Sequence, residues 1–189
     1  MQGLGYKLDL AKAQELFDAS GVGPVELTLT YGSGSASAVG VSLETLMPKI
    51  QADLQQIQGL TIKLEPMEPQ ARRQAFRESK LQFTYSGWSP DYADVHAYAE
   101  PFALTGGAAA KRVAYSNPRV DELLAQGIVE LDPAKRQAIY VEVQKLMIDD
   151  AAFVVTEQPN DKKPASKAVQ GVTTHSVYMI QLRYASKSA

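Results

Sequence analysis

Residues 25–31 read VELTLTY, an alternation of apolar and polar side chains that is typical of a β-strand with one buried face. A Gly/Ser-rich loop follows at Gly32–Ser37. Beyond this loop, apolar residues recur at helical spacing and stop before Gly59, which predicts an amphipathic helix. The stripe comprises Val39, Leu43, Leu46, Met47, Ile50, Leu54 and Ile57. Pro48 lies off the stripe, so it either kinks this helix or marks its true start.

Two further strands are predicted, at Thr61–Met67 and Leu81–Trp88, with a helix at Pro69–Lys80 between them. The order strand, helix, strand, helix, strand favours parallel pairing with right-handed crossovers. We therefore expect an α/β fold with a mostly parallel sheet flanked by helices.

The rest of the chain is predicted to be mostly helical. Pro101 interrupts a helix at Ala93–Leu104, and Asn117-Pro118 and Asp132-Pro133 each start a further helix as a cap followed by proline. The first of these two helices places Val120, Leu123, Leu124 and Ile128 on one face. With a strand at Ala152–Thr156, residues 1–156 form one α/β lobe. Residues 157–189 are irregular, except for a strand predicted at Val177–Tyr184.

Composition narrows the class of function. The chain has 189 residues, a net charge of −2, two histidines and no cysteine. Scattered Lys and Arg residues argue against a nucleic-acid partner, which requires clustered positive charge. The absence of cysteine excludes disulfides and thiolate metal sites. No Ser/His/Asp constellation or HExxH motif is present, so the sequence favours a binding protein without a cofactor over an enzyme.

The stretch YSGWSPDYAD at residues 85–94 marks the expected ligand site. In open α/β sheets, ligands bind beyond the carboxyl ends of the strands, where the strand order reverses. If strand 25–31 is central, the loops Gly32–Ser37 and Gly87–Tyr92 flank that crevice. Trp88 and Tyr92 offer flat apolar faces, and Asp91 offers an anion for a ligand's ammonium group. An equally weighted alternative buries Trp88 in the core and makes Asp91 cap the next helix through the Asp94 N–H.

The sequence is also compatible with two other functions. Asp91, Asp94, His96 and Glu100 form the one local cluster of metal-ligand residue types, compatible with a small metal-dependent hydrolase using Asp91, Asp94 and His96. On a helix, however, Asp94 and His96 would point about 200° apart, so only a loop could bring them together. The third possibility is a free-standing interaction domain.

Four segments, in order, resemble one protein family. They are YKLDLAKAQELFDASGVG (6–23), LMPKIQADLQQIQGLTIKLEPM (46–67), LQFTYSGWSPDYADV (81–95) and YSNPRVDELLAQGIVELDPAKRQAIYVEVQKLMIDDAAFVV (115–155). Together they resemble the C-terminal lobe of the dipeptide/oligopeptide/nickel solute-binding proteins of bacterial ABC importers. The resemblance covers nearly the whole chain, and it is weak after Thr156.

The resemblance implies one lobe of a periplasmic-binding-protein type II fold, in which two lobes close on a ligand and deliver it to a membrane permease. By the family's signature, Asp91 binds the N-terminal amine of a peptide and Trp88 lines a side-chain pocket, while Tyr92 matches the signature without an assigned role. The full-length protein is then periplasmic or lipid-anchored at the bacterial cell surface. The family's N-terminal lobe and export signal are absent from this sequence, so we interpret the chain as a fragment whose partner is the missing lobe.

Overall fold

The computed structural model describes residues 6–158, 164–174 and 180–188. The chain separates into two compact units, which are described one at a time. The first, here called the sheet unit, holds the chain up to Gly87 together with residues 112–114 and 148–157. The second, here called the helix unit, holds residues 88–111 and 115–147 and is grouped with the chain after residue 157. None of the described helices is both long enough and apolar enough to cross a membrane.

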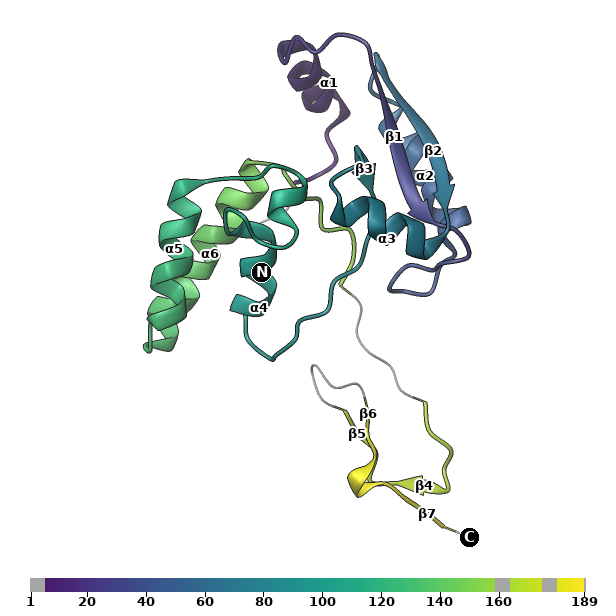
Figure 1. Ribbon diagram of the computed structural model, residues 1–189, viewed down its shortest axis with the longest axis vertical. Coiled ribbons are helices and arrows are strands. Elements are labelled where there is room, and N and C mark those ends of the chain that lie inside the picture. The colour runs from purple at the N-terminus through teal and green to yellow at the C-terminus, as the bar shows by residue number, and fades with distance from the viewer. Residues whose placement is uncertain (1–5, 159–163, 175–179, 189) are drawn as a thin grey trace. The chain divides into compact units, whose positions relative to one another are not determined.

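Three parallel strands form the sheet of the first unit: β1 (Val25–Gly32), β2 (Leu60–Met67) and β3 (Phe83–Thr84). Their order is β2-β1-β3, which confirms the central position expected for β1. β1 pairs with β2 along its whole length, from Val25 opposite Leu60 to Gly32 opposite Met67 (Figure 1). The α/β class with parallel strands and flanking helices is therefore confirmed.

β3 is much shorter than the predicted strand Leu81–Trp88. Only Leu29–Phe83 and Thr30–Thr84 pair across to β1. The ladder does not extend backwards because the Thr28 N–H donates to the side-chain amide oxygen of Gln82, at 3.0 Å, instead of to a backbone carbonyl. It ends forwards with the Tyr85 N–H, which donates to the Thr30 carbonyl oxygen.

Three helices accompany the sheet: α1 (Leu10–Ala19), α2 (Leu43–Leu54) and α3 (Pro69–Arg77). Pro48 lies inside α2, so it does not mark the start of that helix. Val39, which was predicted on the helical stripe, precedes α2 and is exposed. The apolar core of the unit lies between α2 and the sheet and comprises Leu29, Tyr31, Leu43, Met47 and Ile62.

The strand predicted at Ala152–Thr156 is not formed. Both edges of β1 are already paired, and Val154 and Val155 are 78% and 85% exposed. The segment is held at its end by Glu157, whose carboxylate accepts hydrogen bonds from the Ala38 N–H and from the Tyr85 hydroxyl. Side-chain hydrogen bonds thus replace the predicted strand pairing.

The helix unit contains α4 (His96–Ala103), α5 (Pro118–Val129) and most of the 3₁₀ turn η1 (Ala110–Arg112) and of α6 (Pro133–Asp149). Figure 1 shows α5 and α6 packed side by side. Both predicted starts are confirmed, because Asn117 accepts from the Arg119 N–H and Asp132 accepts from the Ala134 N–H. The core comprises Ala103, Val120, Leu123, Leu124, Tyr140 and Val143.

Ile128 does not join the buried face predicted for α5, since it is 57% exposed. Gly127 takes the buried position beside it, against the ring of Tyr140. The Tyr140 hydroxyl is fixed in turn by His96 Nδ1 at 2.8 Å. The bulk of the tyrosine ring therefore fills the space in which a side chain from α5 would otherwise pack.

A bidentate ion pair ties the start of α4 to α6. Arg136 donates from its two terminal nitrogens to the two carboxylate oxygens of Asp94, at 2.8 and 2.9 Å, and from Nε to the Gly127 carbonyl oxygen. Asp94 also accepts from the His96 N–H at 2.7 Å. Hydrogen bonding from Arg136 is the main reason that the pKa of Asp94 lies below its ordinary value of 3.8.

After residue 163 the described chain forms two short antiparallel pairs. β4 (Val169–Gln170) pairs with β7 (Ser186–Lys187), and β5 (Thr173–Thr174) pairs with β6 (Ile180–Gln181). Of the strand predicted at Val177–Tyr184, residues 177–179 lie outside the described part of the chain, and Leu182–Tyr184 form a 3₁₀ turn.

We expect Gly127→Ala to destabilise the protein. Alanine normally stabilises a helix interior by about 1 kcal/mol relative to glycine. Here the new Cβ would meet the Tyr140 ring at 3.0 Å, and the hydrogen bond to His96 keeps that ring in place. Overpacking of this kind costs about 1–3 kcal/mol, so urea unfolding should show a lower free energy of unfolding. The control is Gln126→Ala at the exposed neighbouring position; a Gly127→Ala variant more stable than the wild type would refute the tight contact.

We expect Asp94→Asn to lower the free energy of unfolding at pH 7 by about 1.5–3 kcal/mol, because it removes a charge-assisted pair. Since the folded-state pKa of Asp94 is lowered, its contribution is fully present above pH 3.8 and is lost as the pH falls through the lower folded value. Urea unfolding of both proteins from pH 7 to acid should show the difference shrinking below that point. Asp53→Asn, which breaks an exposed pair with Lys49, should cost less than about 1 kcal/mol. If the difference in free energy of unfolding between the wild type and Asp94→Asn did not change with pH, the lowered pKa of Asp94 would be contradicted.

Candidate functional site

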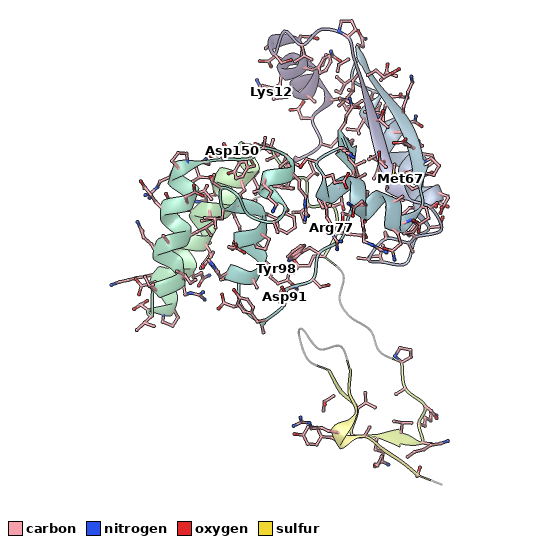
Figure 2. The ribbon with its side chains drawn as sticks, viewed as in Figure 1. Lys12, Met67, Arg77, Asp91, Tyr98 and Asp150 are labelled. Atoms are coloured by element: carbon pink, nitrogen blue, oxygen red, sulfur yellow. The ribbon has the colours of Figure 1, made fainter. Side chains whose placement is uncertain are left out.

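The three predicted ligand-binding residues share the loop that precedes α4 in the helix unit, where Figure 2 shows Asp91. Trp88 is 41% exposed, and its indole ring meets the Phe102 ring edge-on, with 5.3 Å between ring centroids. Tyr92 is 51% exposed. Trp88 is therefore only partly buried, and it keeps aromatic surface available to a ligand.

Asp91 does not cap the following helix, so that alternative is wrong. The Asp94 N–H donates to the Tyr92 carbonyl oxygen, and the carboxylate at the start of α4 is that of Asp94. Asp91 is exposed, and within the described part of the chain no hydrogen bond or ion pair reaches its carboxylate. It is thus an anion free to meet an incoming cationic group.

Two residues of the metal-hydrolase alternative, Asp94 and His96, serve the fold instead. Both carboxylate oxygens of Asp94 bind Arg136, and His96 Nδ1 bonds to the Tyr140 hydroxyl. Among the residues that the structure describes, no group of three or more His, Asp or Glu side chains is placed to hold a metal ion. The geometry therefore does not favour the alternative based on Asp91, Asp94 and His96.

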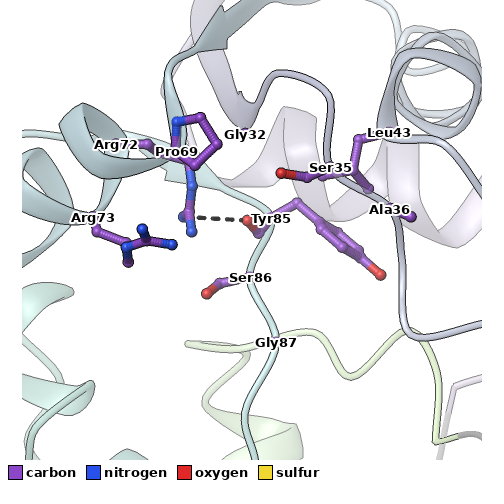
Figure 3. A pocket seen from close by; sticks show the side chains of 10 residues that line it. All are labelled: Gly32, Ser35, Ala36, Leu43, Pro69, Arg72, Arg73, Tyr85, Ser86 and Gly87. Carbon is purple, nitrogen blue, oxygen red and sulfur yellow. Dashed lines mark hydrogen bonds between the residues drawn. The ribbon is translucent and has the colours of Figure 1, made fainter. Parts of the chain in front are cut away.

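The sheet unit has a pocket of its own, with a volume of about 110 Å³, at the carboxyl ends of β1 and β3 (Figure 3). Part of the predicted rim loop contributes to it through Ser35 and Ala36. The full lining comprises Gly32, Ser35, Ala36, Leu43, Pro69, Arg72, Arg73, Tyr85, Ser86 and Gly87. A cavity thus forms at the edge of the sheet at which the strand order predicts one.

Arg72 and Arg73 were missed as site residues by the sequence argument. Arg72 is half-buried and donates from one terminal nitrogen to Thr84 Oγ1 at 3.3 Å and to the Tyr85 carbonyl oxygen at 3.4 Å. Burial and then the adjacent charge of Arg73 lower the pKa of the Arg72 guanidinium. The order of the elements could have indicated both arginines. Because α3 starts immediately after β2, its first turns lie at the carboxyl edge of the sheet.

The hydroxyl end of Tyr85 is fixed by Glu157, which lies in the last segment of the sheet unit. The tyrosine hydroxyl donates to Glu157 Oε1. Burial, followed by this bond to a carboxylate, raises the pKa of Tyr85, and the same bond lowers the pKa of Glu157. Tyr85 is therefore a rigid wall of the pocket and stays protonated at neutral pH.

Comparison with known proteins adds relatives at low identity. No protein-family model matches the sequence. The probable D,D-dipeptide-binding periplasmic protein DdpA of Escherichia coli is 29% identical over 168 residues, which are 88% of this chain and 31% of DdpA. The dipeptide-binding protein DppE of Bacillus subtilis is 27% identical over 162 residues, covering 86% of this chain and 28% of DppE. The chain thus spans less than a third of the length of these relatives.

Among solved structures, the ABC transporter substrate-binding protein CtaP of Listeria monocytogenes matches with a TM-score of 0.68 and 28% identity. The match covers 78% of this chain and 29% of CtaP. This likeness agrees with the α/β fold and its parallel sheet. In sequence and fold the chain therefore resembles part of the peptide-binding solute-binding proteins of ABC importers.

Proposed function

We propose that the chain is the C-terminal ligand-binding lobe of an extracytoplasmic substrate-binding protein that captures peptides for an ABC importer. The observation that carries the proposal is the free carboxylate of Asp91, exposed on a loop between two aromatic residues, Trp88 and Tyr92. DdpA and DppE, named as dipeptide-binding proteins, support a peptide ligand. DdpA is also named as periplasmic, which supports a location outside the cytoplasm.

In this proposal the protein binds its ligand and performs no reaction. Asp91 accepts charge-assisted hydrogen bonds from the N-terminal ammonium group of a peptide, an interaction worth about 1.5–3 kcal/mol. Trp88 and Tyr92 pack against apolar parts of the first side chains, where a flat ring accepts varied shapes. A second lobe completes the cleft, and the closed protein docks on the permease subunits in the membrane, either free or held there by a lipid anchor.

The proposal predicts that a free peptide amine is required for binding. An NMR titration suits one lobe, because half of a cleft gives weak affinity and NMR detects it. We expect trialanine to shift the Trp88 indole signal in a saturable way, and N-acetyl-trialanine to bind about tenfold more weakly or worse, since it has lost the ammonium charge.

The matched variants are Asp91→Asn and Asp149→Asn, which remove one carboxylate each; Asp149 is an exposed residue at the end of α6. Asp91→Asn should lower the affinity for trialanine to that for N-acetyl-trialanine. Asp149→Asn should leave the affinities for both peptides unchanged. Equal binding of the two peptides to the wild type, or no trialanine-dependent shift at Trp88, would overturn the proposed role.

A further inference from the structure

Two arginine side chains meet at the pocket of the sheet unit without a matching carboxylate. Arg72 is half-buried, and the groups that accept its hydrogen bonds, Thr84 Oγ1 and the Tyr85 carbonyl oxygen, are neutral. Arg73 lines the same pocket. Within the described residues, no carboxylate oxygen lies within 4.0 Å of either guanidinium group. Figure 3 shows both groups directed toward the segment Tyr85–Gly87.

The glutamates of neighbouring elements are engaged with other donors. Glu68 caps α3 by accepting from the Ala71 N–H. The charge of Arg73 contributes to lowering the pKa of Glu68, but Glu68 does not line the pocket. The others are Glu44, bound to the Gly34 N–H, Glu65, bound to the Thr30 hydroxyl, and Glu157, bound to the Tyr85 hydroxyl. Among the described residues, therefore, no ion pair cancels the positive charge at the pocket.

A positive pocket of this kind stands out in a chain whose net charge is −2. Two adjacent like charges repel, and partial burial strengthens that repulsion by lowering the local dielectric. The guanidinium group of arginine presents several donors in a planar fork that suits anionic oxygens. A volume of about 110 Å³ is enough for one small anionic group and far below the size of sites that enclose a whole drug-sized ligand.

The backbone of the pocket allows an anion to approach closely. Gly32 ends β1, and a Cβ built there would meet Ser35 Oγ at 2.7 Å and Arg72 Nε at 3.7 Å. A side chain at residue 32 would therefore collide with the Ser35 hydroxyl beside the Arg72 guanidinium. Ser35 and Ser86 add hydroxyl groups to the lining.

We propose that this pocket is a subsite for an anionic oxygen group, a carboxylate or a phosphate, held by Arg72 and Arg73. The subsite goes beyond the proposed function, which assigns only a cation-binding role, to Asp91. It gives the ligand a second requirement, a negatively charged group.

The test is an NMR titration of the isotope-labelled chain with sodium acetate and, in parallel, with inorganic phosphate, at an ionic strength held constant with chloride. We expect saturable shifts of the backbone amide signals of Gly32, Ser35 and Gly87. The anion that binds more tightly identifies the source, acetate standing for a carboxylate and phosphate for a phosphoryl group. Shifts that are absent, or that chloride reproduces equally, would overturn the subsite.

Variants distinguish anion binding in the pocket from non-specific attraction to positive charge elsewhere on the chain. Arg73→Gln removes one exposed guanidinium that makes no hydrogen bond within the described residues, so the fold should survive, and affinity should fall about tenfold or more. Arg72→Gln should weaken binding at least as much. Arg77→Gln is the matched control, because Arg77 ends the same helix outside the pocket lining (Figure 2). Its affinity should stay within about twofold.

The outcome is independent of the peptide experiment. Acetate or phosphate binding that Arg73→Gln abolishes establishes the subsite even if trialanine does not bind. Anion affinities unchanged in both Arg72→Gln and Arg73→Gln refute the subsite even if trialanine binds at Asp91.

Discussion

Thr30 lies in the middle of the sheet, 1% exposed, and bonds to both neighbouring strands. Its hydroxyl donates to Glu65 on β2 at 3.0 Å, and its carbonyl oxygen accepts from the Thr84 hydroxyl of β3 at 2.8 Å and from the Tyr85 N–H. A buried hydroxyl or carbonyl group without such partners would cost about 1–3 kcal/mol. β1 is therefore held on both sides near its carboxyl end. This fixes where the chain leaves the sheet after each of the three strands.

The pocket is a consequence of this edge. The loop after β1, the first turns of α3 after β2 and the segment after β3 all begin where parallel strands end, so Gly32, Arg72 and Tyr85 meet. Arg72 spans two of these segments, since it starts from α3 and donates to Thr84 and Tyr85. A half-buried guanidinium in this position is held by neutral acceptors, which satisfy hydrogen bonds without cancelling charge. The fold thus stabilises the Arg72 side chain without an ion pair among the described residues.

Much of this architecture could be predicted from periodicity and capping residues. The central strand, the parallel order and the starts of α5 and α6 follow from local patterns that tertiary contacts did not override. The length of β3 could not be predicted, because it depends on the Gln82 side chain replacing a backbone acceptor of Thr28. Nor could sequence spacing separate Asp91 from Asp94 as the residue that meets α4, since both are a few residues from its start. Arg72 and Arg73 looked like ordinary polar residues of a surface helix, and only the contacts of the folded chain show that no carboxylate of the described residues pairs with them.

The loop that carries Asp91 is fixed near both ends within the helix unit. Trp88 rests edge-on against Phe102, Pro90 is buried, and Asp94 is clamped by both terminal nitrogens of Arg136. A free loop would lose about 1–2 kcal/mol of backbone entropy for each residue that a ligand orders. Anchoring by Asp94 and Trp88 supplies that order in advance, so under the proposed function more of the charge-assisted interaction at Asp91 would remain as affinity. Two aspartates three residues apart therefore differ in their surroundings: Asp94 is paired with Arg136 within the fold, whereas Asp91, to which we propose a ligand-binding role, is bonded by no described residue.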